Sequence, residues 1–290
     1  MDILRKLQLA ELYMMKKVAQ ICEENDIRYY LCGGSLLGAI RHGGFIPWDD
    51  DLDITMYRED LSRLCEIISR DYSDVFFVQN FETDKHYTRY ITKIRLNGTK
   101  QAEEGYDKDD IHQGIYIDIF PLDHVTKRDG AGLKFRGRLL RFLFAYKTAR
   151  CTKDKSATRG KKILIKILKP FTYLIPQSFI NRLFHWTCTA TDKPDAKYTT
   201  SFASHYKWKR QLVDNEVYGE GILHKFENEE FRIPAQYEKL LLQIFGDKFM
   251  ELPPADKRNS GHTLVDIDLG RYETVVLEMA NESGETIVDG

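Results

Sequence analysis

The sequence predicts an α/β (α+β) fold, because segments with helical and with strand periodicity alternate through its first 126 residues. Apolar residues recur every three or four positions between residues 3 and 21, which predicts an amphipathic helix that packs on the core. Residues 51–56 and 115–120 alternate instead, which predicts two strands that carry carboxylates. At 290 residues, the chain is long enough for one large or two small domains with a real core.

Composition is that of an ordinary soluble globular protein, with 42% hydrophobic and 30% charged residues. The formal net charge is −1, so no overall field selects a polyanion such as nucleic acid as the partner. The five cysteines are scattered without a CxxC pair, which favours a reducing compartment over a disulfide framework or a zinc ribbon. We find neither a bilayer-spanning apolar run nor a signal-peptide core, and we expect a cytoplasmic protein.

The central feature is a glycine–serine stretch between a strand expected over residues 27–32 and a helix expected over residues 36–41. Gly33 and Gly34 allow the backbone to approach a ligand closely, and Ser35 is a favourable N-cap for the helix. Free N–H groups at a helix N-terminus bind anions, so this stretch predicts a phosphate site.

An acidic strand follows, and its alternating pattern places Asp51 and Asp53 on one face. Two carboxylates about 4 Å apart repel each other by roughly 4 kcal/mol at an effective dielectric near 20, and a bound cation reverses that interaction. Oxygen ligands suit Mg²⁺, with Mn²⁺ as the alternative ion. A solvated acidic turn is the competing interpretation.

A third carboxylate lies on a later strand, where Asp118 falls between Tyr116 and Phe120 on one face. Burial of an unpaired carboxylate costs several kcal/mol, so its presence there predicts a metal ligand and proton acceptor beside Asp51 and Asp53. The alternative is that Asp118 accepts backbone hydrogen bonds at the end of the strand.

The composition changes between residues 127 and 169, which contain fifteen Lys and Arg but two Asp and no Glu. Apolar patches alternate with these charges at helical spacing. The pattern is typical of a peripheral membrane contact through residues 127–170, and it also suits an anionic glycan or a lipid-linked substrate. A helical subdomain with a solvated basic face explains the pattern equally well. No nucleic-acid-binding motif accompanies the charge.

We therefore expect a catalytic core at residues 1–126, a basic helical insertion at 127–190, and a C-terminal segment at 191–290 that completes the core. The other expected elements are a helix over 58–70, strands over 75–79 and 87–96, a helical stretch over 181–188, a strand over 197–206, a hairpin over 225–234, a helix over 235–245 and a frayed polar tail from residue 281.

Three blocks of the sequence resemble the LicD family, which includes bacterial phosphocholine transferases and fukutin-type proteins. They are residues 34–42 (GSLLGAIRH) with 45–53 (FIPWDDDLD), residues 116–123 (YIDIFPLD), and a C-terminal block of residues 231–234 (FRIP), 245–247 (FGD), 253–254 (PP) and His262. The resemblance implies a nucleotidyltransferase-like core, in which helices flank a small mixed sheet. The basic insertion matches no motif of the family.

The resemblance further implies Mg²⁺-dependent transfer of a phospho-alcohol group, such as phosphocholine, from a CDP-activated donor. The acceptor is a sugar hydroxyl of a cell-surface glycan or of its lipid-linked precursor. In that reaction Asp51 and Asp53 hold the ion on the diphosphate, and Asp118 ligates the ion and takes the acceptor proton. Gly34 and Ser35 hold a phosphate. With such an acceptor, the expected location is the inner face of the membrane.

Further substrate contacts are expected around this centre. Arg41 and His42 are placed to neutralise phosphate charge, and Trp48 to stack on a base or on a choline methyl group. A loop histidine and a packed turn aromatic explain His42 and Trp48 equally well. The expected set is completed by Lys93, Arg95 and His262.

Three other functions fit parts of the pattern. A glycosyltransferase can use Asp-x-Asp to hold a nucleotide-sugar, and a nucleotidyltransferase with the same metal site releases pyrophosphate and leaves a nucleotide on its product. A calcium-binding module fits least well, because Ile54 stands where an EF-hand loop requires glycine.

Overall fold

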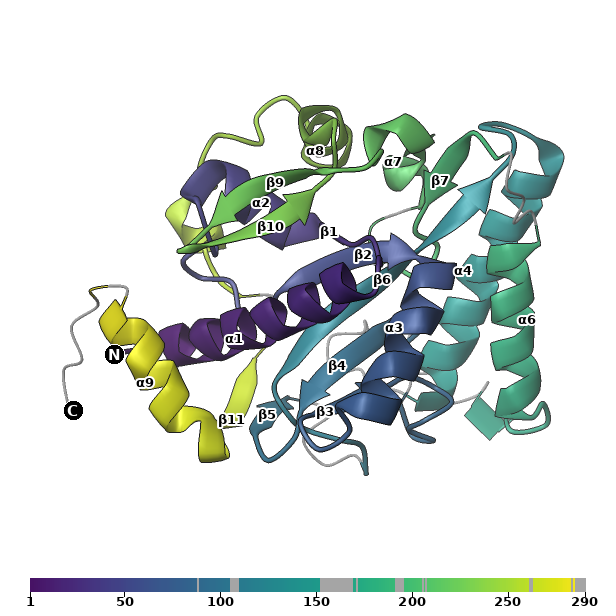
Figure 1. The fold of residues 1–290 in the computed structure, drawn as a ribbon. Helices are drawn as coiled ribbons and strands as arrows, with labels where there is room; N and C mark the ends of the chain where they lie inside the picture. The colour runs from purple at the N-terminus through teal and green to yellow at the C-terminus, as the bar shows by residue number, and fades with distance from the viewer. Residues whose placement is uncertain are drawn as a thin grey trace.

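The computed structural model describes residues 1–87, 89–104, 110–151, 169–170, 172–190, 196–204, 206, 208–260, 263–282 and 284, without the side chains of 147–151. Within these residues, seven strands form one central sheet (Figure 1). Its path runs β1-β2-β6-β4-β3, and β7 and β8 extend it from β6. The strands are β1 (Tyr30–Leu31), β2 (Asp53–Tyr57), β3 (Phe76–Gln79), β4 (Thr92–Leu96), β6 (Tyr116–Val125), β7 (Tyr198–Thr200) and β8 (Val213–Asp214).

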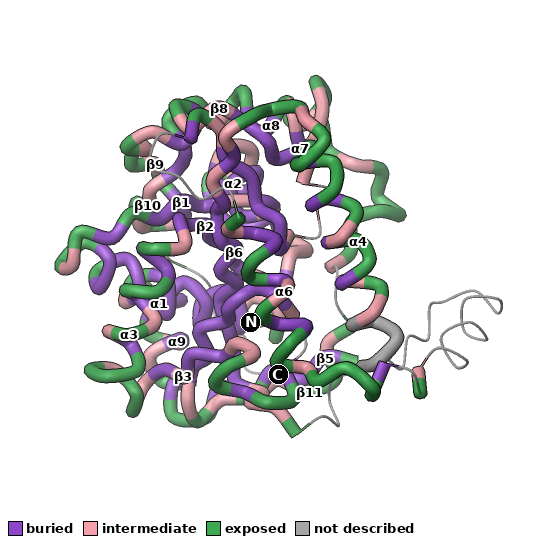
Figure 2. Tube along the Cα trace, turned by 90° about the vertical axis from the view of Figure 1, so that its right-hand side faces the viewer, coloured by how far each residue is buried: buried purple, intermediate pink, exposed green. Residues whose placement is uncertain are grey.

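The pairing of these strands confirms the predicted fold class. β2 and β6 are parallel, whereas the other neighbouring strands are antiparallel, so the sheet is mixed. Figure 2 shows that buried residues are concentrated along β2 and β6 in the middle of the molecule. A strand that is buried on both faces reads as a continuous apolar run, as residues 115–122 largely do.

Helices cover the sheet. α1 (Ile3–Glu24) buries an apolar stripe that includes Leu7 and Met14, because these positions recur on one helical face. α3 (Arg58–Asp71) follows β2 directly and packs against β2, β3 and β6. α9 (Glu273–Glu282), which is not expected from the sequence pattern, packs on α1 (Figure 1).

The C-terminal half adds the predicted hairpin and helix, as β9 (Ile222–Phe226), β10 (Glu229–Ile233) and α8 (Tyr237–Phe245). The hairpin packs on β1 and α2 and thereby completes the core from a distant part of the chain. The remaining short elements are β5 (Lys100–Glu103), which pairs with β11 (Leu264–Asp268), α7 (Trp208–Gln211), and turns of 3-10 helix at Asn215–Val217, Ala255–Lys257 and Gly270–Tyr272.

A second apolar cluster lies beside the main core. It joins α4 (Ala131–Cys151) and α6 (Gln177–Thr189) through side chains such as Leu143 and Phe184, and it contacts the sheet through Phe120. These two helices lie in the predicted basic insertion, and Figure 1 shows them side by side at one edge of the molecule. The domain boundaries at residues 126 and 190 stay a prediction.

Helix α2 (Gly33–His42) begins earlier than expected, and Ser35 is not its N-cap. The cap position belongs to Cys32, because its carbonyl accepts the first helical hydrogen bond, from the Leu36 N–H at 3.0 Å. Gly33 follows with a φ of +54°, which glycine adopts without strain. Ser35 lies inside the first turn, where its hydroxyl oxygen accepts a hydrogen bond from the Asp53 N–H at 2.8 Å. The serine therefore joins α2 to β2.

Several strands differ in extent from the expectation. The strand expected over residues 27–32 is reduced to Tyr30–Leu31, and the strand expected over residues 75–79 begins at Phe76. β2 begins at Asp53, two residues after the start of the strand expected over residues 51–56. Just before it, Gln8 donates to the Asp49 carbonyl at 2.9 Å. The strand expected over residues 87–96 begins at Thr92, and the strand expected over 197–206 ends at Thr200. Among the described residues, none of the helices combines the length and the apolar character that a bilayer span requires.

Candidate active site

Two aspartates face each other at the centre of the sheet. β2 and β6 run parallel in a register that pairs Asp53 with Asp118, so carboxylates separated by 65 positions lie on neighbouring strands. Both side chains are buried, with 6% and 3% of their surface exposed. Burial and then the charges of Asp51 and Asp118 hold the pKa of the Asp53 carboxyl well above its usual range.

Three further carboxylates precede β2. Asp49, Asp50 and Asp51 can each offer an oxygen such that the three atoms lie within 4.8 Å of one another. Within the described part of the chain, the buried Oδ1 of Asp53 has no hydrogen-bond partner. Oxygen ligands and an unsatisfied buried carboxylate oxygen match the preferences of Mg²⁺ or Mn²⁺, so these residues fit a divalent ion.

The first turn of α2 lies against these carboxylates. A β-carbon on Gly33 would lie 3.0 Å from Asp53 Oδ2, and one on Gly34 would lie 2.6 Å from Asp49 Oδ2. The helix N-terminus therefore meets the acidic centre closely enough that a side chain on Gly34 would displace a carboxylate, and the φ of +54° at Gly33 also favours glycine. Its N–H groups and its positive dipole end favour an anion at the same place as the metal-binding oxygens.

Lys93 is the immediate counter-charge of Asp118. β4 pairs with β6 so that the two residues are opposite, and Lys93 Nζ lies 2.6 Å from Asp118 Oδ1. The ammonium also lies 3.0 Å from the centroid of the Tyr116 ring. Burial, partly offset by the charge of Asp118, lowers the pKa of Lys93 to about 8.

A second polar layer surrounds this pair. The Tyr116 hydroxyl donates to Glu103 Oε1 at 2.7 Å, and Arg89 donates to Glu103 Oε2 at 2.7 Å. Arg95, predicted to contact the substrate, donates instead to the Gln79 side chain at 2.6 Å and to the Gly114 carbonyl. Arg95, on β4, thereby links its strand to β3 and to the segment that leads into β6.

Glu11 is a buried carboxyl group that the sequence analysis passed over. It is fully buried on α1, and neither of its oxygens has a hydrogen-bond partner among the described residues. Burial and then the charges of Asp51 and Asp50 hold its pKa well above the usual value. A signal was present in the sequence, since Glu11 interrupts the apolar stripe between Leu7 and Met14.

A narrow pocket of about 20 Å³ reaches the acidic centre and is bordered by Gly33, Asp53 and Tyr206. Such a volume holds about one water or ion. Burial and then the charge of Asp53 raise the pKa of the Tyr206 hydroxyl. Nothing in the sequence pattern marks Tyr206, because the contact arises only when the segment after β7 folds over α2.

Other predicted contacts lie at the opposite end of α2. Arg41 and His42 occupy its last turn, and a ten-residue helix is about 15 Å long. Arg41 donates to the carbonyls of Phe249 and Glu251 at 3.1 and 3.3 Å. The Trp48 ring meets His42 edge-on at 6.0 Å, and the guanidinium of Arg258 lies 5.6 Å from the Trp48 ring. His262 lies outside the described residues.

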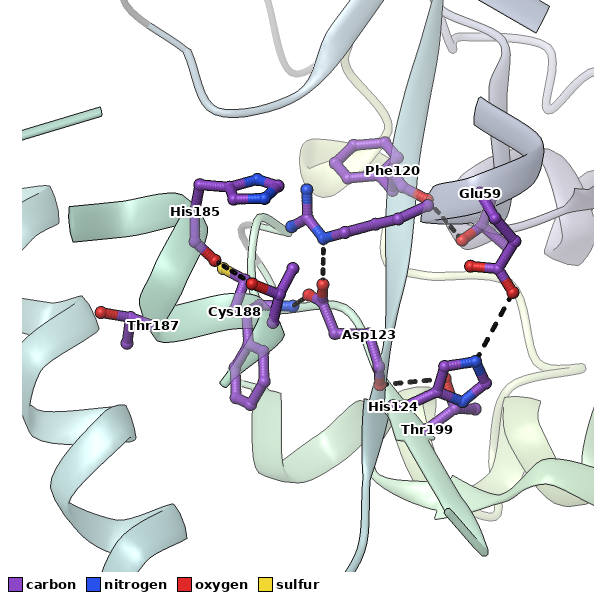
Figure 3. A network of polar contacts seen from close by, with 12 residues as sticks. Glu59, Phe120, Asp123, His124, His185, Thr187, Cys188 and Thr199 are labelled. Atoms are coloured by element: carbon purple, nitrogen blue, oxygen red, sulfur yellow. Dashed lines mark hydrogen bonds and ion pairs between the residues drawn. The ribbon is translucent and has the colours of Figure 1, made fainter. Parts of the chain in front are cut away.

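Asp123, at the far end of β6, anchors the segment after β7, which contributes Tyr206 to the narrow pocket (Figure 3). Its carboxylate forms an ion pair with Arg58 of α3 and accepts from the Phe202 N–H at 3.2 Å. Thr199 of β7 donates to the Asp123 carbonyl at 3.2 Å, and His124 faces Glu59. The network therefore holds β7 and the residues after it against the sheet.

Part of the chain matches a known protein family. Residues 26–132 match the family model described as LicD/FKTN/FKRP, nucleotidyltransferase domain. Lipopolysaccharide cholinephosphotransferase LicD of Haemophilus influenzae is 27% identical in an alignment of length 277 that covers 89% of this chain and 96% of that protein. Human ribitol 5-phosphate transferase FKRP is 40% identical over 68 residues, 23% of this chain and 14% of that protein.

The matched region contains α2, β2 and β6, and hence both facing aspartates, whereas Glu11 and Tyr206 lie outside it. The resemblance inferred from the three sequence blocks is thereby confirmed. The chain carries a LicD-family domain over residues 26–132 and is related to LicD along most of its length.

Proposed function

We propose that this protein is a LicD-type phosphotransferase that moves a phospho-alcohol group from a CDP-activated donor to a sugar hydroxyl of a glycan. The names of its relatives, a cholinephosphotransferase and a ribitol 5-phosphate transferase, support transfer of this class. The observation that carries the proposal is the pairing of Asp53 with Asp118 beside the N-terminus of α2. Phosphoryl transfer depends on positioning and charge neutralisation, which such a centre supplies.

The acidic residues hold the cofactor in this proposal. Asp51 and Asp53 would bind Mg²⁺ together with Asp118, and the ion would neutralise charge on the diphosphate. Gly33 and Gly34 allow the first turn of α2 to present N–H groups to a donor phosphate. Ser35 supports this turn through the bond that its hydroxyl oxygen accepts from the Asp53 N–H, and in our proposal its own N–H and O–H donate to the phosphate.

The acceptor hydroxyl loses its proton during the transfer. Its oxygen bonds to the phosphorus that bears the alcohol, the bond between the two phosphates breaks, and CMP leaves with the electron pair. Asp118 takes the proton in our proposal. Lys93 Nζ lies 2.6 Å from Asp118 Oδ1 and holds that carboxylate in place on β6.

The insertion supplies a surface for the acceptor. Several aromatic side chains on α4 and α6 are half or more exposed, and the same region is rich in Lys and Arg. This combination supports peripheral contact with the inner face of a membrane, where a lipid-linked precursor would lie. The exposed aromatic residues are Phe135, Phe142, Phe179 and Trp186.

Turnover assays with defined donors test the proposal. The protein is incubated with CDP-choline, CDP-ribitol and related CDP-alcohols, with a glycan acceptor, and with Mg²⁺ or EDTA. We expect CMP release that depends on the metal and is lost in Asp53→Asn. Product mass separates the alternatives: a phospho-alcohol adduct supports the proposal, whereas a nucleotide adduct with pyrophosphate, or turnover of UDP- or GDP-sugars, contradicts it. An EF-hand is not formed, because a strand and not a helix follows Asp53.

A further inference from the structure

A large basic and aromatic pocket lies next to the acidic centre. It has a volume of about 550 Å³ and is formed by α4 and the segment that follows β7. It shares Ser204 and Tyr206 with the narrow pocket that reaches Asp53 and Gly33. The two spaces are therefore neighbours that share part of their walls. The larger one falls in the usual size range for small-molecule sites, whereas the narrow one holds only an ion.

The charge of this pocket is uniformly positive among the described residues that line it. Lys134, Arg138 and Arg141 project from one face of α4, since they are spaced by four and three positions, and Lys209 faces them. Lys134 has an ion-pair partner, Asp129, at 3.0 Å. Within the described part of the chain, Arg138 and Arg141 have neither an ion pair nor a hydrogen bond. Two guanidinium groups thus face the pocket with their charge uncompensated, which suits a phosphate.

The remaining lining is aromatic. Phe144, Phe202, Tyr206 and Trp208 border the pocket. Trp208 packs directly on α4 at Gly137, where a β-carbon would lie 2.5 Å from the indole nitrogen. Phe202 is fixed by its N–H bond to Asp123. Phe202 itself is buried, and the guanidinium of Arg136 lies 4.8 Å from the centroid of its ring. The half-buried rings of Phe144, Tyr206 and Trp208 therefore offer the stacking surfaces for a planar base.

We propose that the pocket between α4 and the segment after β7 binds the nucleotide part of the donor. The base stacks on the aromatic side chains, and the phosphate that stays on the nucleoside contacts Arg138 and Arg141. The second phosphate then extends past Tyr206 to α2 and Asp53. This inference rests on the proposed function for the identity of the donor, but it assigns binding to the insertion, which lies largely outside the region that matches the LicD family.

Calorimetric titration with CMP, cytidine and N-acetylglucosamine 1-phosphate tests the assignment without turnover. The variant Arg138→Ala/Arg141→Ala removes both guanidinium groups from an exposed helix face, where alanine is well tolerated. Loss of charge-assisted bonds should weaken CMP binding by at least about tenfold. Cytidine, which lacks the phosphate, should bind the variant as it binds the unmodified protein. Trp208→Leu should weaken both CMP and cytidine.

Arg182→Ala is the matched control, because Arg182 is an exposed arginine on α6 that does not line the pocket. It should leave every affinity unchanged. The proposal is overturned if the unmodified protein does not bind CMP, or if the double variant binds CMP with normal affinity. It is also overturned if the double variant loses affinity for N-acetylglucosamine 1-phosphate alone, because the pocket would then be an acceptor site. If CMP binding follows the pocket variants but no CDP-alcohol is turned over, the pocket assignment stands and the proposed function fails.

Discussion

Asp53 and Asp118 occupy paired positions on adjacent parallel strands, and Lys93 lies opposite Asp118 on the next strand. Two buried acids and one buried base therefore form a row across β2, β6 and β4. Of the two acids, Asp118 is the one in contact with the base: its Oδ1 lies 2.6 Å from Lys93 Nζ. The two carboxylates consequently differ in environment, and the predictions below follow from that difference.

Asp53→Asn should lower turnover by at least about 100-fold, since metal ions contribute several kcal/mol of charge stabilisation in such reactions. In the absence of metal, the same substitution should raise the melting temperature or leave it unchanged, because a charge repelled by Asp51 and Asp118 is removed. Steady-state CMP release and thermal unfolding in EDTA measure the two effects. A marked drop in melting temperature would show that Asp53 has a structural role instead.

Lys93→Met should destabilise the fold by about 3–5 kcal/mol, because it leaves the buried Asp118 carboxylate without its counter-charge. The double variant Lys93→Met/Asp118→Asn should regain most of that loss, since neither charge remains. Chemical denaturation of the two single variants and the double variant gives the coupling free energy. Additive losses would mean that the contact at 2.6 Å contributes nothing to stability.

Gly34→Ala should abolish activity, because its β-carbon would lie 2.6 Å from Asp49 Oδ2 and push the carboxylate away from the centre. The control is Gly132→Ala in α4, where a β-carbon meets nothing within 4 Å. Alanine is favoured over glycine in a helix by about 0.5–1 kcal/mol, so the control should be slightly more stable and fully active. Activity retained in Gly34→Ala would argue against a close approach of α2 to the metal ligands.

Glu11→Gln should make stability less sensitive to pH. The folded-state pKa of Glu11 lies well above 4.5, so the folded protein binds a proton that the unfolded chain releases, and stability falls as pH rises above 4.5. Glutamine cannot lose that proton, so the variant should be the more stable protein at pH 7 and should lose its advantage toward pH 4.5. Denaturant unfolding in EDTA at several pH values measures the difference. A constant difference across that range would contradict the assignment.

Asp123→Ala should destabilise the protein by about 3–5 kcal/mol, because the variant leaves Arg58 without its buried partner and frees the Phe202 N–H. CMP binding should weaken as well, since Phe202 borders the proposed nucleotide pocket. Asp71→Asn, which alters an exposed ion pair with Arg70, should change neither property. Thermal unfolding and calorimetry check both outcomes. If the folded Asp123→Ala variant binds CMP with normal affinity, the contacts of Asp123 do not support the nucleotide pocket.

The sequence by itself determined the local elements around the acidic centre. The glycine pair before an apolar helix, the alternation at residues 53–56 and the aspartate within the apolar run of β6 each reflect the steric and hydrophobic preferences of near neighbours. The class of fold and the resemblance to the LicD family followed from these stretches. The start of α2 differs from the expectation, because the first helical hydrogen bond runs from the Leu36 N–H to the Cys32 carbonyl and leaves Ser35 inside the first turn.

The tertiary structure alone decided which side chains meet. The register that pairs Asp53 with Asp118, the position of Lys93 and the burial of Glu11 near the acidic cluster depend on strands and a helix brought together across long separations. The same is true of Tyr206 and of the pocket on α4, which use segments that share no periodic pattern. Such contacts are set by the packing of the whole core and are not encoded by spacing along the chain.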